Sequence, residues 1–169
     1  NKLRRGLYVF GERYQKRALS KYAIAAKLYS PSYISFESAL SYHGLIPEAV
    51  YVTTSACAQL KKKYYPTPLG DYSYQYIPPN SFRLGVESLS TPGGTFLMAN
   101  PIKALFDLIY IRKKTYPDVS AIQGDLRIEA EELLAALKNY SSAEVEALAK
   151  SYGRKGSEQL FRVLKREFL

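Results

Sequence analysis

One stretch decides the fold: NPIKALFDLIYIRKK, residues 100–114. Asn100 can cap a helix, and Pro101 suits the first helical position, where its missing N–H and fixed φ cost nothing. Apolar side chains then follow at helical spacing on two adjoining stripes: Ile102, Leu105, Phe106 and Ile109 on one, Ala104, Leu108 and Ile111 on the other. A helix that is apolar nearly all round must be buried, so we expect this one at the centre of the molecule.

The residues before this helix predict β-structure. Alternating residues predict a strand over 50–54, and two arms at 61–65 and 72–77 predict a hairpin because a segment rich in Pro and Gly separates them. Two more strands, over 82–89 and 95–99, surround Pro92-Gly93-Gly94. We therefore expect a mixed or mostly antiparallel sheet from about residue 49 to residue 99.

Helices are expected on both sides of that sheet. Before it, a basic strand over 3–10 leads to a helix over 16–29, and Ser35 is expected to cap a short helix that ends at His43-Gly44. After the buried helix, three helical segments are predicted over 129–139, 142–152 and 157–168. The predicted fold class is α+β, with a basic N-terminal strand and helices, a central sheet, a buried helix and a C-terminal helical group.

Composition excludes several kinds of chemistry. The chain has 169 residues, 47% of them hydrophobic, and its only cysteine and histidine are Cys57 and His43. A single cysteine forms no disulfide framework and no multi-cysteine metal site, and the phosphate-loop, dinucleotide, nucleophile-elbow and zinc-protease motifs are missing from the sequence. We expect a non-enzymatic protein that needs no cofactor and no metal. No long apolar run and no signal peptide is present, so we expect a cytoplasmic protein without membrane contact.

Positive charge gathers in the first third of the chain. Residues 1–66 hold eleven Lys and Arg against three Glu, whereas residues 123–169 hold eight of each sign. Such a surplus favours contact with a polyanion, most simply nucleic acid. The candidate phosphate contacts are Arg4, Arg5, Lys16, Arg17, Lys21, Lys61, Lys62 and Lys63. An acidic protein partner, or an edge strand kept soluble by its lysines, would explain the same charges.

Two polar features of the apolar regions have structural and chemical explanations. Lys103 and Asp107 lie one helical turn apart and are interpreted as a buried ion pair that fixes packing, with a catalytic pair as the alternative. His43 directly precedes the expected cap at Gly44, where a ring nitrogen would bond helix-end carbonyls.

Three blocks of the sequence resemble the AbiEi-type antitoxins of bacterial type IV toxin–antitoxin systems. They are RGLY at residues 5–8, YISFESALSYHGLIPE at 33–48 and ANPIKALFD at 99–107. The matching motif residues are Ser35, Glu37, Ser38, His43, Gly44, Pro47, Pro101, Lys103 and Asp107. Ile102 stands where the family usually has an acidic residue, so no role of that acid is carried over.

The resemblance implies a function that composition does not. Proteins of this family typically bind operator DNA through an N-terminal winged helix-turn-helix, repress their own operon and counteract a nucleotidyltransferase-like toxin. It implies that residues 1–12 are the remnant of a wing or a linker, with the DNA-reading helices before Asn1. It also implies an antitoxin α+β domain over 13–122, and a C-terminal helical segment over 123–169 packed on it.

Two other functions stay open. One is a metal-dependent enzyme that processes nucleic acid through Asp107, Asp71 and Lys103, which would need a second carboxylate beside Asp107. The other keeps the family but makes the chain purely a protein-binding module.

Overall fold

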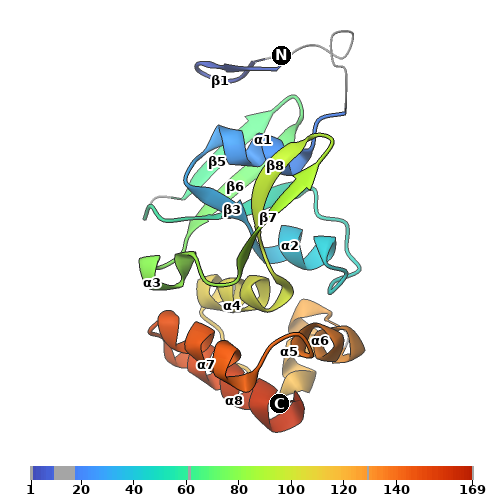
Figure 1. Cartoon of the computed structure of the whole chain (residues 1–169), viewed down its shortest axis with the longest axis vertical. Coiled ribbons are helices and arrows are strands. Elements are labelled where there is room, and N and C mark those ends of the chain that lie inside the picture. The colour runs from blue at the N-terminus through green and yellow to red at the C-terminus, as the bar shows by residue number, and fades with distance from the viewer. Residues whose placement is uncertain (1, 10–17, 61, 129, 169) are drawn as a thin grey trace.

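The computed structural model of the chain describes residues 2–9, 18–60, 62–128 and 130–168. The molecule is elongated, with a small hairpin at one end, a sheet in the middle and a group of helices at the other end (Figure 1). Within the described residues the strands are β1 (Lys2–Arg4), β2 (Leu7–Tyr8), β3 (Ser32–Ile34), β4 (Val52–Cys57), β5 (Lys63–Thr67), β6 (Gly70–Tyr76), β7 (Val86–Thr91) and β8 (Gly94–Ala99). The helices are α1 (Lys21–Leu28), α2 (Phe36–Tyr42), α3 (Pro79–Phe82), α4 (Pro101–Arg112), α5 (Val119–Leu126), α6 (Ala130–Leu137), α7 (Ser142–Ser151) and α8 (Lys155–Phe168).

The described residues form a mixed six-stranded sheet with the strand order β5-β6-β4-β3-β8-β7. The predicted hairpin is confirmed, because β5 pairs antiparallel with β6, and the next two strands, β7 and β8, also pair antiparallel. The central strand, β3, runs antiparallel to β4 and parallel to β8. The prediction that the sheet begins near residue 49 is therefore wrong, since a strand of three residues directly after Pro31 is too short to show a period.

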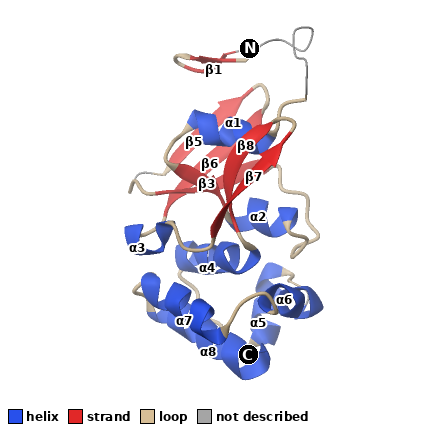
Figure 2. Ribbon diagram, in the orientation of Figure 1, coloured by secondary structure: helices blue, strands red, loops and turns tan. Residues whose placement is uncertain are grey.

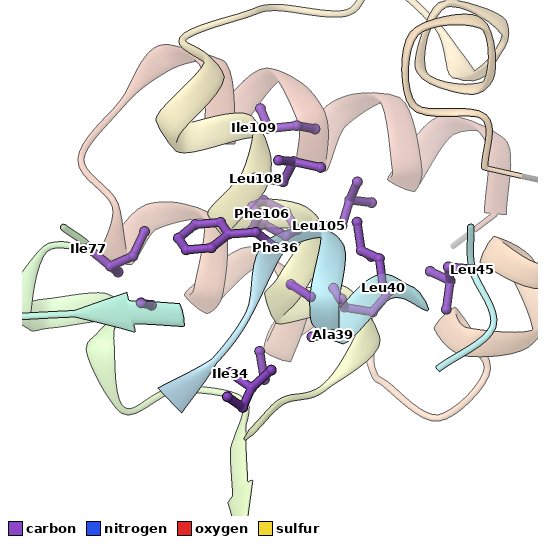
Figure 3. Packing of buried hydrophobic residues seen from close by; sticks show 14 of the residues in the cluster. Ile34, Phe36, Ala39, Leu40, Leu45, Ile77, Leu105, Phe106, Leu108 and Ile109 are labelled. Carbon is purple, nitrogen blue, oxygen red and sulfur yellow. The ribbon is translucent and has the colours of Figure 1, made fainter. Parts of the chain in front are cut away.

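Helix α4 lies at the centre, as its sequence predicts. The Asn100 side chain accepts a hydrogen bond from the backbone N–H of Lys103 at 2.8 Å, and every residue from Ile102 to Ile109 is buried. Phe36 and Leu40 of α2 pack beside Leu105 and Phe106 of α4 (Figure 3). On another side, α1 packs against β3, β4 and β8, and Figure 2 shows it lying across the strands. The sheet and α4 thus form one core.

The C-terminal helices pack on α4 and on one another. Helix α8 contacts α4, α5 and α7. Helix α7 begins with a capping box, in which the Ser141 hydroxyl and the Glu144 carboxylate bond each other's backbone N–H. Helix α5 was not predicted, and the expected domain boundary between residues 122 and 123 falls inside it. The helices that follow α4 therefore include α5, which begins at Val119.

The N-terminal elements differ from their predictions. In place of one strand over 3–10, β1 and β2 form a two-stranded hairpin, and its turn requires a positive φ of 79° at Gly6. Helix α1 begins at Lys21 after a cap from the Ser20 hydroxyl, while Lys16 and Arg17 lie outside the described residues. The strand expected over 82–89 begins only at Val86, because Pro79–Phe82 is α3.

In the parts of the chain that the structure describes, no helix combines the length and apolarity that crossing a bilayer requires.

Candidate functional site

A buried polar network surrounds Asp107 in the middle of α4. Its Oδ2 atom accepts hydrogen bonds from the Tyr33 hydroxyl at 2.9 Å and from the Ser35 hydroxyl at 2.7 Å. Its Oδ1 atom accepts one from the Tyr152 hydroxyl at 2.6 Å and lies 2.9 Å from the Lys103 Nζ atom. The carboxylate therefore has four partners, which matches the number of lone-pair sites that an ionised carboxylate offers.

Lys103 is satisfied in the same way. Its Nζ atom donates to the Ser81 carbonyl at 2.7 Å and to the Tyr152 hydroxyl at 2.8 Å, in addition to its ion pair with Asp107. The ammonium also lies 4.7 Å from the centre of the Tyr152 ring. An ammonium has three donors, and all three are used, so its charge is tolerated although the side chain is fully buried.

Burial sets the protonation of this network. It raises the pKa of Tyr33 and of Tyr152 well above the ordinary value, and the negative charge of Asp107 raises both further. It also lowers the pKa of Lys103, although the neighbouring carboxylate of Asp107 opposes that change. Both phenols therefore stay protonated and act as donors to Asp107.

The network joins four elements, and all of its side chains are buried. Tyr33 comes from β3, Ser81 from α3, Lys103 and Asp107 from α4, and Tyr152 from the end of α7. Among the described cavities, none is lined by Asp107 or Lys103. The buried interpretation of this pair is thus the one that its geometry supports, and the network connects the sheet to the C-terminal helices.

The remaining motif residues also make structural contacts. Ser38 and Thr54 bond each other through their hydroxyls and backbone N–H groups, which fixes α2 against β4. The Glu37 carboxylate lies 3.3 Å from the Arg112 guanidinium. Gly44 takes the predicted left-handed conformation, with φ of 77°, Pro101 opens α4, and Pro47 is exposed.

Two predictions about the motif are wrong. The His43 Nε2 atom donates to the Ala99 carbonyl at 2.9 Å, so the ring holds the end of β8 rather than the end of its own helix. Ser35 stands at the N-cap position of α2, but its hydroxyl makes no capping bond, because it donates to Asp107. Both side chains bond partners more than 50 residues away, which local sequence patterns do not reveal.

The two carboxylates of the alternative enzyme hypothesis have different partners. Asp107 bonds only groups of the buried network, whereas Asp71 of β6 accepts from the Tyr64 hydroxyl on β5. Within the described residues, no group of three or more His, Cys, Asp or Glu is placed to hold a metal ion. The arrangement around Asp107 offers hydrogen-bond donors and a cation rather than a second carboxylate.

A second feature is a set of cations on the N-terminal hairpin, on α1 and at the start of β5. We call the described members the N-terminal cations: Lys2, Arg4, Arg5, Lys21, Lys27, Lys62 and Lys63. Of the predicted phosphate contacts, Arg4, Arg5, Lys21 and Lys62 are exposed and Lys63 is half-buried, while Lys16, Arg17 and Lys61 lie outside the described residues. Strand β1, which ends at Arg4, packs beside β5, which begins at Lys63.

The N-terminal cations form no ion pair with any described residue. Two described acidic residues of the first half pair elsewhere: Glu37 with Arg112, and Glu48 with Arg127 at 3.0 Å. Lys63 lies over the Tyr29 ring at 5.3 Å, a contact that positions its ammonium without neutralising it. The N-terminal cations therefore carry positive charge that a polyanion could neutralise.

Comparisons of the sequence with protein-family models and with curated proteins found no match.

Proposed function

We propose that the protein is an antitoxin of the AbiEi type, which counteracts a nucleotidyltransferase-like toxin and contributes to repression of its own operon by binding DNA in the cytoplasm. The observation that carries the proposal is the meeting of two sequence blocks in one network. Tyr33 and Ser35 of the block over 33–48 bond Asp107 of the block over 99–107. If the two blocks are parts of one family motif, their residues should contact each other in the folded protein, as these do.

The N-terminal cations support the DNA-binding part of the proposal. Lysine and arginine side chains that are not paired with an acidic side chain can neutralise phosphates and release the counterions condensed on DNA. They would position the duplex rather than read its sequence, because phosphates are the same at every base pair. In the proposed protein they would extend the contact made by a separate DNA-reading element.

The salt dependence of DNA binding tests this part. Fluorescence anisotropy with a labelled duplex from the promoter of the operon gives the slope of log K against log salt. Arg4→Ala with Lys62→Ala should reduce the slope by about two, since each lost phosphate contact removes about 0.9. Lys138→Ala with Lys165→Ala, which removes two exposed lysines of the C-terminal helices, should leave it unchanged. Equal slopes for all three proteins would contradict the phosphate role.

The antitoxin part is tested separately, by co-expression with the toxin candidate encoded beside the gene. The same experiment separates toxin neutralisation from DNA binding. If the Arg4→Ala with Lys62→Ala variant binds DNA with a reduced salt dependence but still rescues growth, neutralisation does not require these phosphate contacts.

A further inference from the structure

A basic pocket lies where the end of α4 meets the turn between α7 and α8. It has a volume of about 350 Å³, within the range of small-molecule sites. One wall is formed by Ile109, Tyr110 and residues 113–115, and the other by residues 153–157. No Asp or Glu lines it. It shares no residue with the N-terminal cations and lies in the other part of the molecule (Figure 1).

Three cations of this pocket have no ion pair with a described residue: Lys113, Arg154 and Lys155. The fourth cation, Lys114, forms an ion pair, with its Nζ atom 2.5 Å from the Asp125 carboxylate. The Arg154 guanidinium lies 4.5 Å from the centre of the Tyr110 ring, which positions the group on the wall of the pocket and leaves its charge uncompensated. The pocket therefore has a net positive charge.

The first turn of α8 adds backbone donors. The helix runs from Lys155 to Phe168, and the N–H groups of Lys155 and Gly156 bond no acceptor among the described residues. Such free N–H groups and the positive end of the helix dipole attract anions, phosphate above all. A Cβ atom at Gly156 would come within 3.1 Å of the Lys114 carbonyl, so glycine allows this turn to lie close to the end of α4.

An orphaned hydroxyl in the same pocket points independently to a ligand. Ser157 is 1% exposed and lines the pocket, yet its Oγ atom has no hydrogen-bond partner in the described part of the chain. Buried hydroxyls in folded proteins nearly always have a partner, and one that lacks it calls for an explanation. A ligand oxygen bound at the start of α8 would supply the missing acceptor.

We infer that this pocket binds a phosphate group, carried by a nucleotide or by single-stranded nucleic acid. The lining residues supply three cations without an ion pair to a described residue, two backbone N–H groups without an acceptor among the described residues and one unpaired hydroxyl, and none of them is acidic. The turn reads Gly153-Arg154-Lys155-Gly156 between two helices, and a Gly-x-x-Gly turn lets backbone approach a phosphate closely, as it does in the KH class of RNA-binding modules. The inference does not depend on the proposed antitoxin function.

Isothermal titration calorimetry with the whole chain tests the inference. The probes are pyrophosphate, ATP and a short single-stranded RNA, and the variants are Lys113→Ala with Lys155→Ala, and Ser157→Ala. The control, Lys138→Ala with Lys165→Ala, removes the same charge at exposed sites outside both the pocket and the N-terminal cations. Melting temperatures of all variants establish that each one folds.

The pocket variant should weaken binding at least about tenfold, the effect of losing a charge-assisted hydrogen bond, while the control keeps the affinity of the parent chain. Ser157→Ala should weaken binding without lowering the melting temperature, because its hydroxyl makes no bond in the free protein. Tighter binding of ATP and pyrophosphate identifies a free nucleotide as the source, and tighter binding of RNA identifies nucleic acid. Absence of binding by every probe at millimolar concentration, or equal affinity of the pocket variant and the control, would overturn the inference.

Discussion

The Lys103 Nζ atom lies 2.9 Å from the Asp107 Oδ1 atom, and both side chains are fully buried one turn apart on α4. Removing two charges from water is expensive, and their mutual attraction compensates only when hydrogen bonds satisfy the remaining donors and acceptors. Here the hydroxyls of Tyr33, Ser35 and Tyr152 donate hydrogen bonds to the Asp107 carboxylate. The Ser81 carbonyl accepts one from the Lys103 ammonium. The pair therefore specifies how the sheet, α3 and α7 pack around α4.

Lys103→Met should lower the free energy of unfolding by about 3–5 kcal/mol, because it leaves the Asp107 carboxylate buried without a cation. Urea denaturation measures this change. Lys138→Met is the matched control, since Lys138 is exposed and should change stability by less than about 0.5 kcal/mol. A Lys103→Met variant as stable as the control would show that the ion pair does not hold the core together.

Tyr152→Phe should cost about 1–3 kcal/mol, because the Tyr152 hydroxyl both donates to Asp107 and accepts from Lys103. The control is Tyr110→Phe, in which the altered ring packs against Tyr152 at 5.5 Å between centroids and lies outside the network. The comparison uses the same denaturation experiment. Similar stabilities of the two variants would mean that the ring of Tyr152, not its hydroxyl, connects α7 to α4.

Asp125 should make the protein sensitive to acid. Hydrogen bonds from Lys114 and Tyr116 lower the pKa of its carboxyl group to about 2, below the value near 4 expected in the unfolded chain. A lowered folded pKa contributes stability that is present above pH ~4 and is lost as the pH falls through the folded pKa. Melting temperatures measured from pH 5 to pH 2 should fall less steeply for Asp125→Asn than for the parent chain. The control is Glu131→Gln, at an exposed residue without an ion pair to a described residue, and its melting temperature should fall with pH as steeply as that of the parent chain. An equally steep fall in Asp125→Asn would show that Asp125 does not cause the acid sensitivity.

Local signals in the sequence predicted some elements well. The cap at Asn100, Pro101 and two apolar stripes all favour the same helix, and α4 occupies residues 101–112. The hairpin of β5 and β6 follows from its turn residues and alternation in the same way. Strand β3 was not predicted, because its place in the sheet depends on pairing with β4 and β8 and not on a pattern within its own three residues.

The sites were harder to predict, since their parts are distant in sequence. Lys103 and Asp107 are visible as a pair on one helix, but their partners Tyr33 and Tyr152 lie 74 and 45 residues from Asp107. The basic pocket was hidden for another reason. Residues 123–169 carry as many acidic as basic side chains, so their net charge is zero, although Arg154 and Lys155 have no acidic side chain among their pocket neighbours. Net charge along a chain does not show how charges separate in space.

Growth rescue tests the central proposal most directly. The chain and any nucleotidyltransferase-like protein found to be encoded beside its gene are expressed from separate inducible promoters, and growth is followed after induction of each alone and of both together. The proposal predicts that the partner alone stops growth and that co-expression of the chain restores it, while the destabilised Lys103→Met variant restores it less. Continued growth arrest in cells that contain the folded chain would contradict the antitoxin function.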